Sequence, residues 1–229
     1  MGEVTYFVQV TVADQGMTLM KLLHIDSSIS GELSASRQLS AAVVAALKQA
    51  MPALEVIRRD LDAEPIPHLD SRRLPTVRPA NAPEGAAGIP DPEGASALDE
   101  FLTAEIVVIG APMYNFTVPT QLKAWIDRII IAGKTFRYGE TGPVGLARGK
   151  RVIITSSRGG LYAPGMPFEA NDFQEKYLRA IFAFIGIEEV EIVRAEGLAF
   201  GPEQREAAIG AALGSVPAAV TRFTTREAA

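Results

Sequence analysis

Short apolar runs rich in β-branched residues alternate with helical periodicity along most of the chain. Residues 105–110 (EIVVIG) form the clearest run, and unbroken apolar character is typical of a strand buried on both faces of a parallel sheet. Four similar runs predict further strands, at residues 21–25, 54–61, 151–156 and 190–195. Together these runs predict five strands.

Helical periodicity fills the segments between these strands. Leu39, Val43, Leu47 and Met51 recur at a spacing of four, which predicts a helix from about residue 36 to 49 that Pro52 ends. Similar patterns predict helices at 96–104, from Pro119 to about 130, at 173–185 and at 203–223. The alternation predicts an α/β fold: one doubly wound, five-stranded parallel sheet with helices on both faces.

The expected strand order is 2-1-3-4-5, one of the common orders of doubly wound sheets. We expect one domain over residues 20–229. Residues 1–19 are interpreted as an N-terminal extension or tag outside the core, or as an added edge strand, because Tyr6, Val8 and Val10 alternate. Seven prolines between residues 62 and 95 predict an irregular segment with at most one turn of helix.

Sheets of this kind bind ligands beyond the carboxyl ends of their strands, at the point where the strand order reverses. The segment after the first strand, residues 26–36 (DSSISGELSAS), offers serine hydroxyls followed by the N-terminus of a helix. That combination can hold a phosphate without lysine. Alternatively, the segment is a solvated loop in which a serine caps the helix.

The segments after the third and fourth strands also have unusual compositions. Residues 113–116 place Met, Tyr, Asn and Phe together in a loop. Their apolar faces and the amide could contact a flat ring of a ligand. Alternatively, the aromatic side chains only complete the core. Residues 157–160 (SRGG) contain two adjacent glycines, which allow positive φ and a close approach of the backbone to a ligand. Alternatively, the glycines form a plain turn and Arg158 is a surface cation.

Composition and charge exclude several classes of function. The net charge of −5 argues against nucleic-acid binding, and no apolar stretch is long enough for a membrane span. Without cysteine the chain has no disulfide, thiolate nucleophile or Fe–S ligand, which fits a cytoplasmic protein, and no metal site is expected. His24 is predicted to be a core or sheet-face histidine instead of a catalytic base, and Asp127 to lie on a solvated helix face or in a structural pair.

Competing motifs are absent from the sequence. No G-x-G-x-x-G follows a strand, and no G-x-S-x-G nucleophile elbow exists, which disfavours a hydrolase on the same sheet. Residues 145–150 resemble a P-loop only faintly, because their spacing is short and they precede a strand.

Several segments together resemble one family. They are DSSISGELSASRQLS, APMYNFTVPTQLKAWID, TFRYGETGPVGL, ITSSRGG, FIGI and RAEGLAFGP. From Met20 to about Val220 the chain is similar to the flavodoxin-like FMN-dependent NADH:quinone oxidoreductases, also called azoreductases. The resemblance implies bound FMN, NADH or NADPH as electron donor, and a quinone or azo compound as acceptor. It also implies a homodimer with the site at the interface.

The resemblance also implies the roles of individual residues. The phosphate and ribityl end would be held by Ser28, Ser34, Ala35 and Ser36. The isoalloxazine would be held by Met113, Tyr114, Asn115 and Phe116 and by Ser157, Arg158, Gly159 and Gly160. Tyr114, Phe116, Phe136 and Tyr138 are candidates for aromatic walls around a planar acceptor, or alternatively for core residues. The chain departs from the family at Ala35, where relatives often have Gln, and around residues 82–94.

The implied mechanism needs no catalytic side chain, because the flavin carries the chemistry. One flavin face would serve NAD(P)H and then the acceptor, in a ping-pong order. The alternative is an FMN-binding electron carrier or regulatory flavoprotein without NAD(P)H turnover.

Overall fold

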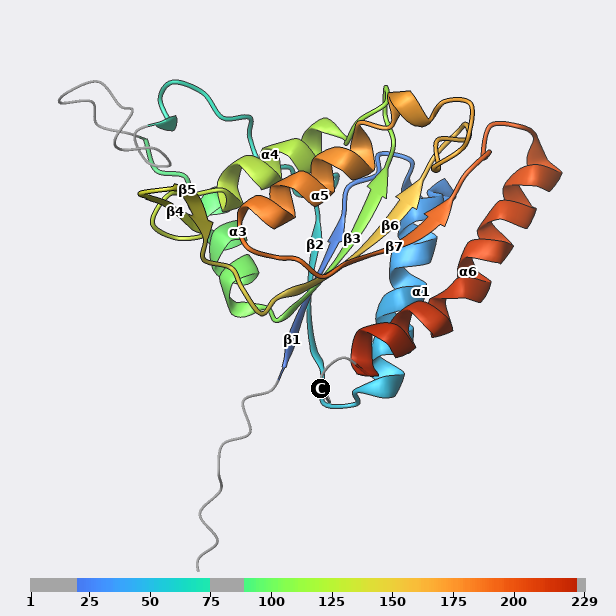
Figure 1. Cartoon of the computed structure of the whole chain (residues 1–229), viewed down its shortest axis with the longest axis horizontal. Coiled ribbons are helices and arrows are strands. Elements are labelled where there is room, and N and C mark those ends of the chain that lie inside the picture. Colours follow the sequence, from blue (N-terminus) through green and yellow to red (C-terminus); the bar gives the residue numbers. More distant parts are fainter. Residues whose placement is uncertain (1–19, 75–88, 226–229) are drawn as a thin grey trace, which may run out of the picture.

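The computed structural model describes residues 20–74 and 89–225 (Figure 1). The expectations for residues 1–19 and for the middle of the proline-rich segment lie outside the described residues. On either side of that gap, residues 61–73 form turns and coil, and a helix begins at Pro92.

Five parallel strands form the central sheet. They are β1 (Lys21–Asp26), β2 (Glu55–Asp60), β3 (Ile106–Pro112), β6 (Arg151–Ser157) and β7 (Val190–Ala195). Their order is β2-β1-β3-β6-β7, and every neighbouring pair is parallel. β3 and β6 are buried along their whole length, and for β3 its unbroken apolar run predicts this.

The flavodoxin-like parallel sheet of five strands is confirmed, but the predicted order 2-1-3-4-5 is not matched as stated. Two additional strands, β4 (Phe136–Gly139) and β5 (Gly142–Gly145), precede β6 and pair antiparallel in a separate sheet. Each has only four residues, and together they contain glycines and a proline in place of an apolar run. The sequence pattern of these two strands is therefore too short to predict them.

Helices cover both faces of the sheet, as predicted (Figure 1). On one face lie α1 (Ala35–Ala50) and α6 (Pro202–Thr225). On the other lie α3 (Pro92–Thr103), α4 (Thr120–Ile129) and α5 (Gln174–Phe184). Strand alternation explains the two layers, because Ile106 and Val108 of β3 pack with the α1 and α6 side, whereas Val107 and Ile109 pack with the α3, α4 and α5 side.

One helix boundary differs from the expectation. α3 begins at Pro92, four residues before the predicted start, so the predicted boundary is wrong and residues 92–95 form the one turn of helix that the prediction allowed. Proline lacks a backbone N–H and has a fixed φ, but neither property disturbs the first turn of a helix, where the N–H has no partner in any case. This reason does not apply to Pro217, because Pro217 lies inside α6 and not in its first turn.

Candidate functional site

The loops after β1, β3 and β6 converge on one cavity of about 150 Å³ at the carboxyl end of the sheet. The predicted site residues that line it are Ser28, Ser34, Ala35, Met113, Tyr114, Ser157, Arg158 and Gly159. Ser36, Asn115, Phe116 and Gly160 do not line this cavity. The expectation that the three loops share one edge of the sheet is thus confirmed.

Hydrogen bonds join the three loops to one another. The Tyr114 hydroxyl lies 3.2 Å from Ser28 Oγ and accepts from the backbone N–H of Ile29 at 3.2 Å. The backbone N–H of Met113 donates to the Ser157 carbonyl oxygen at 2.8 Å. Tyr114 and Met113 therefore fix the loop after β3 to both of its neighbours.

The serine end of the cavity is the N-terminus of α1. Ser34 is the N-cap, and its Oγ accepts from the backbone N–H of Arg37 at 3.2 Å and lies 3.1 Å from Ser36 Oγ. The N–H groups of Ala35 and Ser36 belong to the first turn, where no intrahelical carbonyl is available. Ser34 is thus a helix cap and also lines the cavity, so the two interpretations of this loop coexist.

The loop after β3 contains the strongest backbone distortion in the site. Asn115 and Phe116 have φ of 46° and 70°, the left-handed region that a bulky side chain rarely adopts. The turn is closed by Tyr114 and Thr117, each of which donates its N–H to the other's carbonyl. It leaves the Phe116 ring 46% exposed, so the alternative in which this aromatic only completes the core is wrong for Phe116.

Phe116 begins an aromatic rim beside the cavity. Its ring centroid lies 6.2 Å from that of Tyr162, and Tyr162 lies 6.1 Å from Phe168. Phe168 is 52% exposed. This rim offers flat apolar surface to a planar ligand.

The alternative in which Arg158 is only a surface cation is wrong. Its side chain is fully buried and forms ion pairs with Glu175, with Asp172 at 3.1 Å and with Glu196 at 3.1 Å. Its Nε donates to Ser156 Oγ at 2.9 Å. Because three carboxylates already surround this guanidinium, Arg158 reaches the cavity as a structural residue and not as a free positive charge.

The two glycines after Arg158 do not adopt the positive φ that their pairing suggested. At Gly160 the reason for glycine is space, because a Cβ there would lie 3.1 Å from the ring of Tyr162. Glycine therefore allows an aromatic residue of the rim to pack against the backbone.

The two polar residues that the sequence assigned to structure do lie in structural pairs. His24 is buried, with Nε2 2.9 Å from Ser40 Oγ and 3.5 Å from Asp26 Oδ1. Burial raises the pKa of Asp26, but bonds from His24, Ser40 and Arg58 and the His24 charge outweigh burial and hold the pKa below its ordinary value. Asp127 pairs with Lys123 at 2.6 Å, one turn away on α4.

Several cavity residues were not among the individually predicted FMN ligands. Ser30 and Leu33, which border the short helix η1 (Gly31–Leu33) or belong to it, lie in the serine-rich segment 26–36 that the sequence did predict as a binding loop. Pro112 ends β3, and Leu198 follows β7. Arg205 comes from the first turns of α6 and donates through Nη2 to the Leu33 carbonyl oxygen at 2.5 Å. No sequence pattern links Arg205 to the serine loop, because 172 positions separate it from Leu33.

Two of the four aromatic residues that were candidates for walls of the site lie away from the cavity. Phe136 is buried in the core, with its ring 4.7 Å from that of Phe184. Tyr138 is 77% exposed on the β4–β5 hairpin. Neither residue lines the cavity of a single chain: Phe136 follows the core alternative, and the role of Tyr138 stays a prediction.

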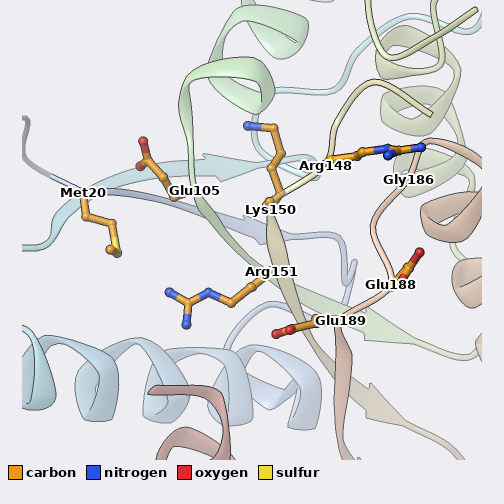
Figure 2. Close-up of a pocket in the computed structure, with 9 residues that line it drawn as sticks. Met20, Glu105, Arg148, Lys150, Arg151, Gly186, Glu188 and Glu189 are labelled. Atoms are coloured by element: carbon orange, nitrogen blue, oxygen red, sulfur yellow. The ribbon is translucent and has the colours of Figure 1, made fainter. Parts of the chain in front are cut away.

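A larger cavity of about 510 Å³ lies at the opposite end of the sheet (Figure 2). Its charges are mixed, and Figure 2 shows the side chains of Lys150 and Arg151 diverging from adjacent positions. Lys150 donates to the carbonyls of Leu102 and Ala104, and Arg151 donates to Phe223 O, so both cations have structural partners. The smaller cavity has the chemistry of a site; the larger one does not.

Neither a metal site nor a membrane helix is apparent in what the structure describes. No three His, Asp or Glu residues among those described are grouped so that they could hold a metal ion. Within residues 20–74 and 89–225, none of the helices combines the length and apolar character of a membrane crossing.

The donor set of the small cavity fits a ligand with a phosphate at one end and a flat ring at the other. Serine hydroxyls, the N-terminus of α1 and Arg205 lie at the first end. Met113, Tyr114 and residues 157–159, from the other two loops, offer apolar surface and backbone for a flat ring, and the Tyr114 hydroxyl reaches the serine loop. FMN has this division of chemistry.

Comparisons with known proteins agree with this description. Residues 20–218 match a family model described as having the flavodoxin-like fold. A protein of Stenotrophomonas maltophilia named FMN-dependent NADH:quinone oxidoreductase is 56% identical over 198 residues, which cover 86% of this chain and 95% of that protein. A protein of Methylocella silvestris with the same name is 57% identical over 191 residues, covering 83% and 94%.

Solved structures show the same similarity. The crystal structure of an azoreductase from Bacillus anthracis superposes with a TM-score of 0.79 at 30% identity, covering 89% of this chain and 100% of that one. An FMN-dependent NADH-azoreductase from Bacillus anthracis, solved in complex with FMN, gives a TM-score of 0.77 at 28% identity, covering 89% and 99%.

Proposed function

The chain belongs to the FMN-dependent NADH:quinone oxidoreductases, within the family that has the flavodoxin-like fold, and from this membership we propose how its site works. The protein is an FMN-dependent oxidoreductase that passes electrons from NADH to quinones and azo compounds. The observation that carries the assignment to this chain's own residues is the convergence of the loops after β1, β3 and β6 on one cavity.

The phosphate of FMN would be held at the N-terminus of α1. Ser28 and Ser34 line the cavity there, and the N–H groups of Ala35 and Ser36 are left without helical partners. Since Ala35 has no polar side chain, it contributes only its backbone N–H. Ser36 lies behind Ser34 and acts on the site through the bond between their hydroxyls.

The ring system would lie along the second half of the cavity. Met113 and Tyr114 supply its wall, and Ser157 and Gly159 bring backbone close to it. Asn115 and Phe116 would act from the rim, where their strained turn directs them outward. Arg158 would act through its backbone and by anchoring the loop, because its guanidinium is bound to three carboxylates.

When bound, FMN supplies the redox chemistry, since its ring system can accept a hydride and release electrons. The residues of the chain bind and orient the reactants. The Phe116–Tyr162–Phe168 rim offers one apolar face on which a nicotinamide or a planar acceptor can lie. No side chain is needed as an acid or base for hydride transfer.

A single open face implies that the two substrates use it in turn. We therefore propose a ping-pong order, in which oxidised nicotinamide leaves before the acceptor enters. Initial rates with menadione at several fixed NADH concentrations should give parallel reciprocal plots. Intersecting plots would contradict this order and would require a second pocket.

We also propose that the protein is a homodimer with the site at the interface. Large apolar side chains that are exposed in the segment between β6 and α5 support this: Met166 is 42%, Phe168 52% and Phe173 56% exposed. A cytoplasmic location is proposed because the donor, NADH, is an intracellular metabolite. Sedimentation of the purified protein at twice the chain mass is the expected result for the dimer, and a monomer would contradict it.

Residues 1–19 are proposed to lie outside the catalytic unit, because the family match begins at residue 20. Deletion of residues 1–16 should leave flavin content, melting temperature and turnover nearly unchanged. A fall of several degrees in melting temperature would mean that these residues contribute to the folded core.

The assignment of the cofactor is tested by the flavin itself. The purified protein should be yellow, and heat should release about one FMN per chain and no FAD, as chromatography can determine. A colourless protein that cannot be reconstituted with FMN would overturn the proposed function.

A further inference from the structure

Arg205 is placed at the phosphate end of the cavity by the fold alone. It is the fourth residue of α6 and lines the cavity with Ser30, Leu33 and Ser34. Its Nη2 donates to the Leu33 carbonyl oxygen at 2.5 Å. One guanidinium thus connects α6 to the short helix η1 that follows the serine loop.

The positive charge of Arg205 has no ion-pair partner among the described residues. The other arginine that lines the cavity, Arg158, is surrounded by three carboxylates. Arg37, which follows the N-cap of α1, is paired with Asp60. Arg205 is therefore the uncompensated cation of this cavity within the part of the chain that the structure describes.

The position of this charge does not favour helix stability. A cation near the N-terminus of a helix opposes the helix dipole, by about 0.3–1 kcal/mol at an exposed site. The N-terminus of α1, which also has positive character, borders the same cavity. The Arg205 guanidinium and the N-terminus of α1 repel each other, and an anion bound between them would offset this repulsion.

We propose that Arg205 is a ligand for the phosphate of the bound flavin and makes the site selective for a phosphorylated flavin. This inference rests on the proposed function of the site as an FMN site. A guanidinium has five N–H donors, so it can keep its bond to Leu33 O and still donate to a phosphate. Arg205 would then hold η1 and the phosphate together.

Comparison of FMN with riboflavin isolates this role, because riboflavin has the same ring and ribityl chain without the phosphate. Flavin-free protein would be titrated with each flavin, and quenching of flavin fluorescence would give the dissociation constants. The variants are Arg205→Gln, which keeps an N–H donor for Leu33 O, and Arg205→Lys, which keeps the charge. Arg148→Gln, an exposed arginine at the opposite end of the sheet, is the matched control.

Arg205→Gln should bind FMN about tenfold to hundredfold more weakly, as expected for loss of a charge-assisted hydrogen bond, and riboflavin within about twofold of the unchanged protein. Arg205→Lys should recover part of the FMN affinity. The FMN affinity of the unchanged protein should also fall more steeply with added salt than that of Arg205→Gln. Arg148→Gln should bind both flavins normally.

Equal losses for FMN and riboflavin would overturn the inference, because Arg205 would then only hold the loop. Unchanged FMN affinity with a raised KM for NADH would also overturn it, since the anion would be a phosphate of the nicotinamide nucleotide. If the unchanged protein bound neither flavin, the proposed function would fail and this inference with it.

Discussion

The phenol oxygen of Tyr114 lies 3.2 Å from the hydroxyl oxygen of Ser28, and this contact joins two loops that are 86 positions apart in the chain. Tyr114 belongs to the loop proposed to hold the ring of FMN, and Ser28 to the loop proposed to hold its phosphate. A side chain of the protein itself therefore links the two loops.

Tyr114→Phe should loosen this link while keeping the aromatic wall. The change removes the bonds to Ser28 Oγ and to the Ile29 N–H, each worth about 0.5–1.5 kcal/mol. We expect FMN affinity to fall about threefold to tenfold in titrations of flavin-free protein. Tyr138→Phe, at an exposed ring on the β4–β5 hairpin, is the control and should bind normally. Equal affinity in both variants would mean that the link plays no part in binding.

Replacement of Ser34 and Ser36 together by Ala should weaken FMN binding tenfold or more. The double change removes the Ser34 hydroxyl, which lines the cavity, and the Ser36 hydroxyl, which contacts it. Hydrogen bonds to a charged group such as phosphate are worth about 1.5–3 kcal/mol each. It also removes the N-cap of α1, which should lower stability by about 1 kcal/mol.

The two effects can be separated by measuring thermal unfolding of flavin-free protein beside the titration. Ser215→Ala, on the far part of α6, controls for loss of a helix serine. Reduced stability with unchanged FMN affinity would show that Ser34 serves only as a cap.

The ion pair of Arg37 with Asp60 should make stability depend on pH in the acid range. The side-chain hydrogen bond from Arg37 is the main cause that lowers the pKa of Asp60 from 3.8 to about 2. Since this pKa is lower in the folded protein than in the unfolded chain, the pair's contribution is complete above about pH 4 and is lost as pH falls toward 2.

Asp60→Asn should therefore be less stable than the unchanged protein at about pH 6, with a difference that shrinks toward pH 2. Urea unfolding of flavin-free protein across this range measures it. Asp99→Asn, at an exposed position of α3, should show no such trend. A difference that stays constant with pH would contradict the assignment of the effect to this carboxylate.

Arg158→Met should strongly destabilise the folded chain. It leaves Asp172, Glu175 and Glu196 without their shared cation, and removal of one partner of a buried ion pair typically costs about 3–5 kcal/mol. Arg179→Met, at an arginine whose bond to Val190 O is exposed, should cost far less in the same urea unfolding measurement. Similar values for the two variants would mean that the buried network contributes little.

The general position of the site could be predicted from the sequence, because it follows from chain order. Five apolar runs alternating with helices define the sheet, and its carboxyl edge must then bring residues 26–36, 113–116 and 157–160 together. The details could not be predicted in this way. The burial of Arg158 depends on carboxylates between 14 and 38 positions away, and the role of Gly160 depends on the ring of Tyr162.

Other features were missed because their local signal is weak. The strands β4 and β5 have four residues each and contain glycine and proline, so they show no apolar periodicity. Arg205 lies on a helix with an ordinary polar face, and only the packing of α6 against α1 brings it to the serine loop. Periodicity identifies elements, whereas contacts between distant elements require the folded structure.

The central claim is that the flavin held by these loops is reduced by NADH and reoxidised by a quinone. The most direct measurement adds NADH to the purified, FMN-loaded protein without oxygen and follows the visible absorbance of the flavin. We expect about one equivalent of NADH to remove that absorbance and menadione to restore it. A flavin that stays oxidised in excess NADH would contradict the account and would instead indicate an electron carrier without NADH turnover.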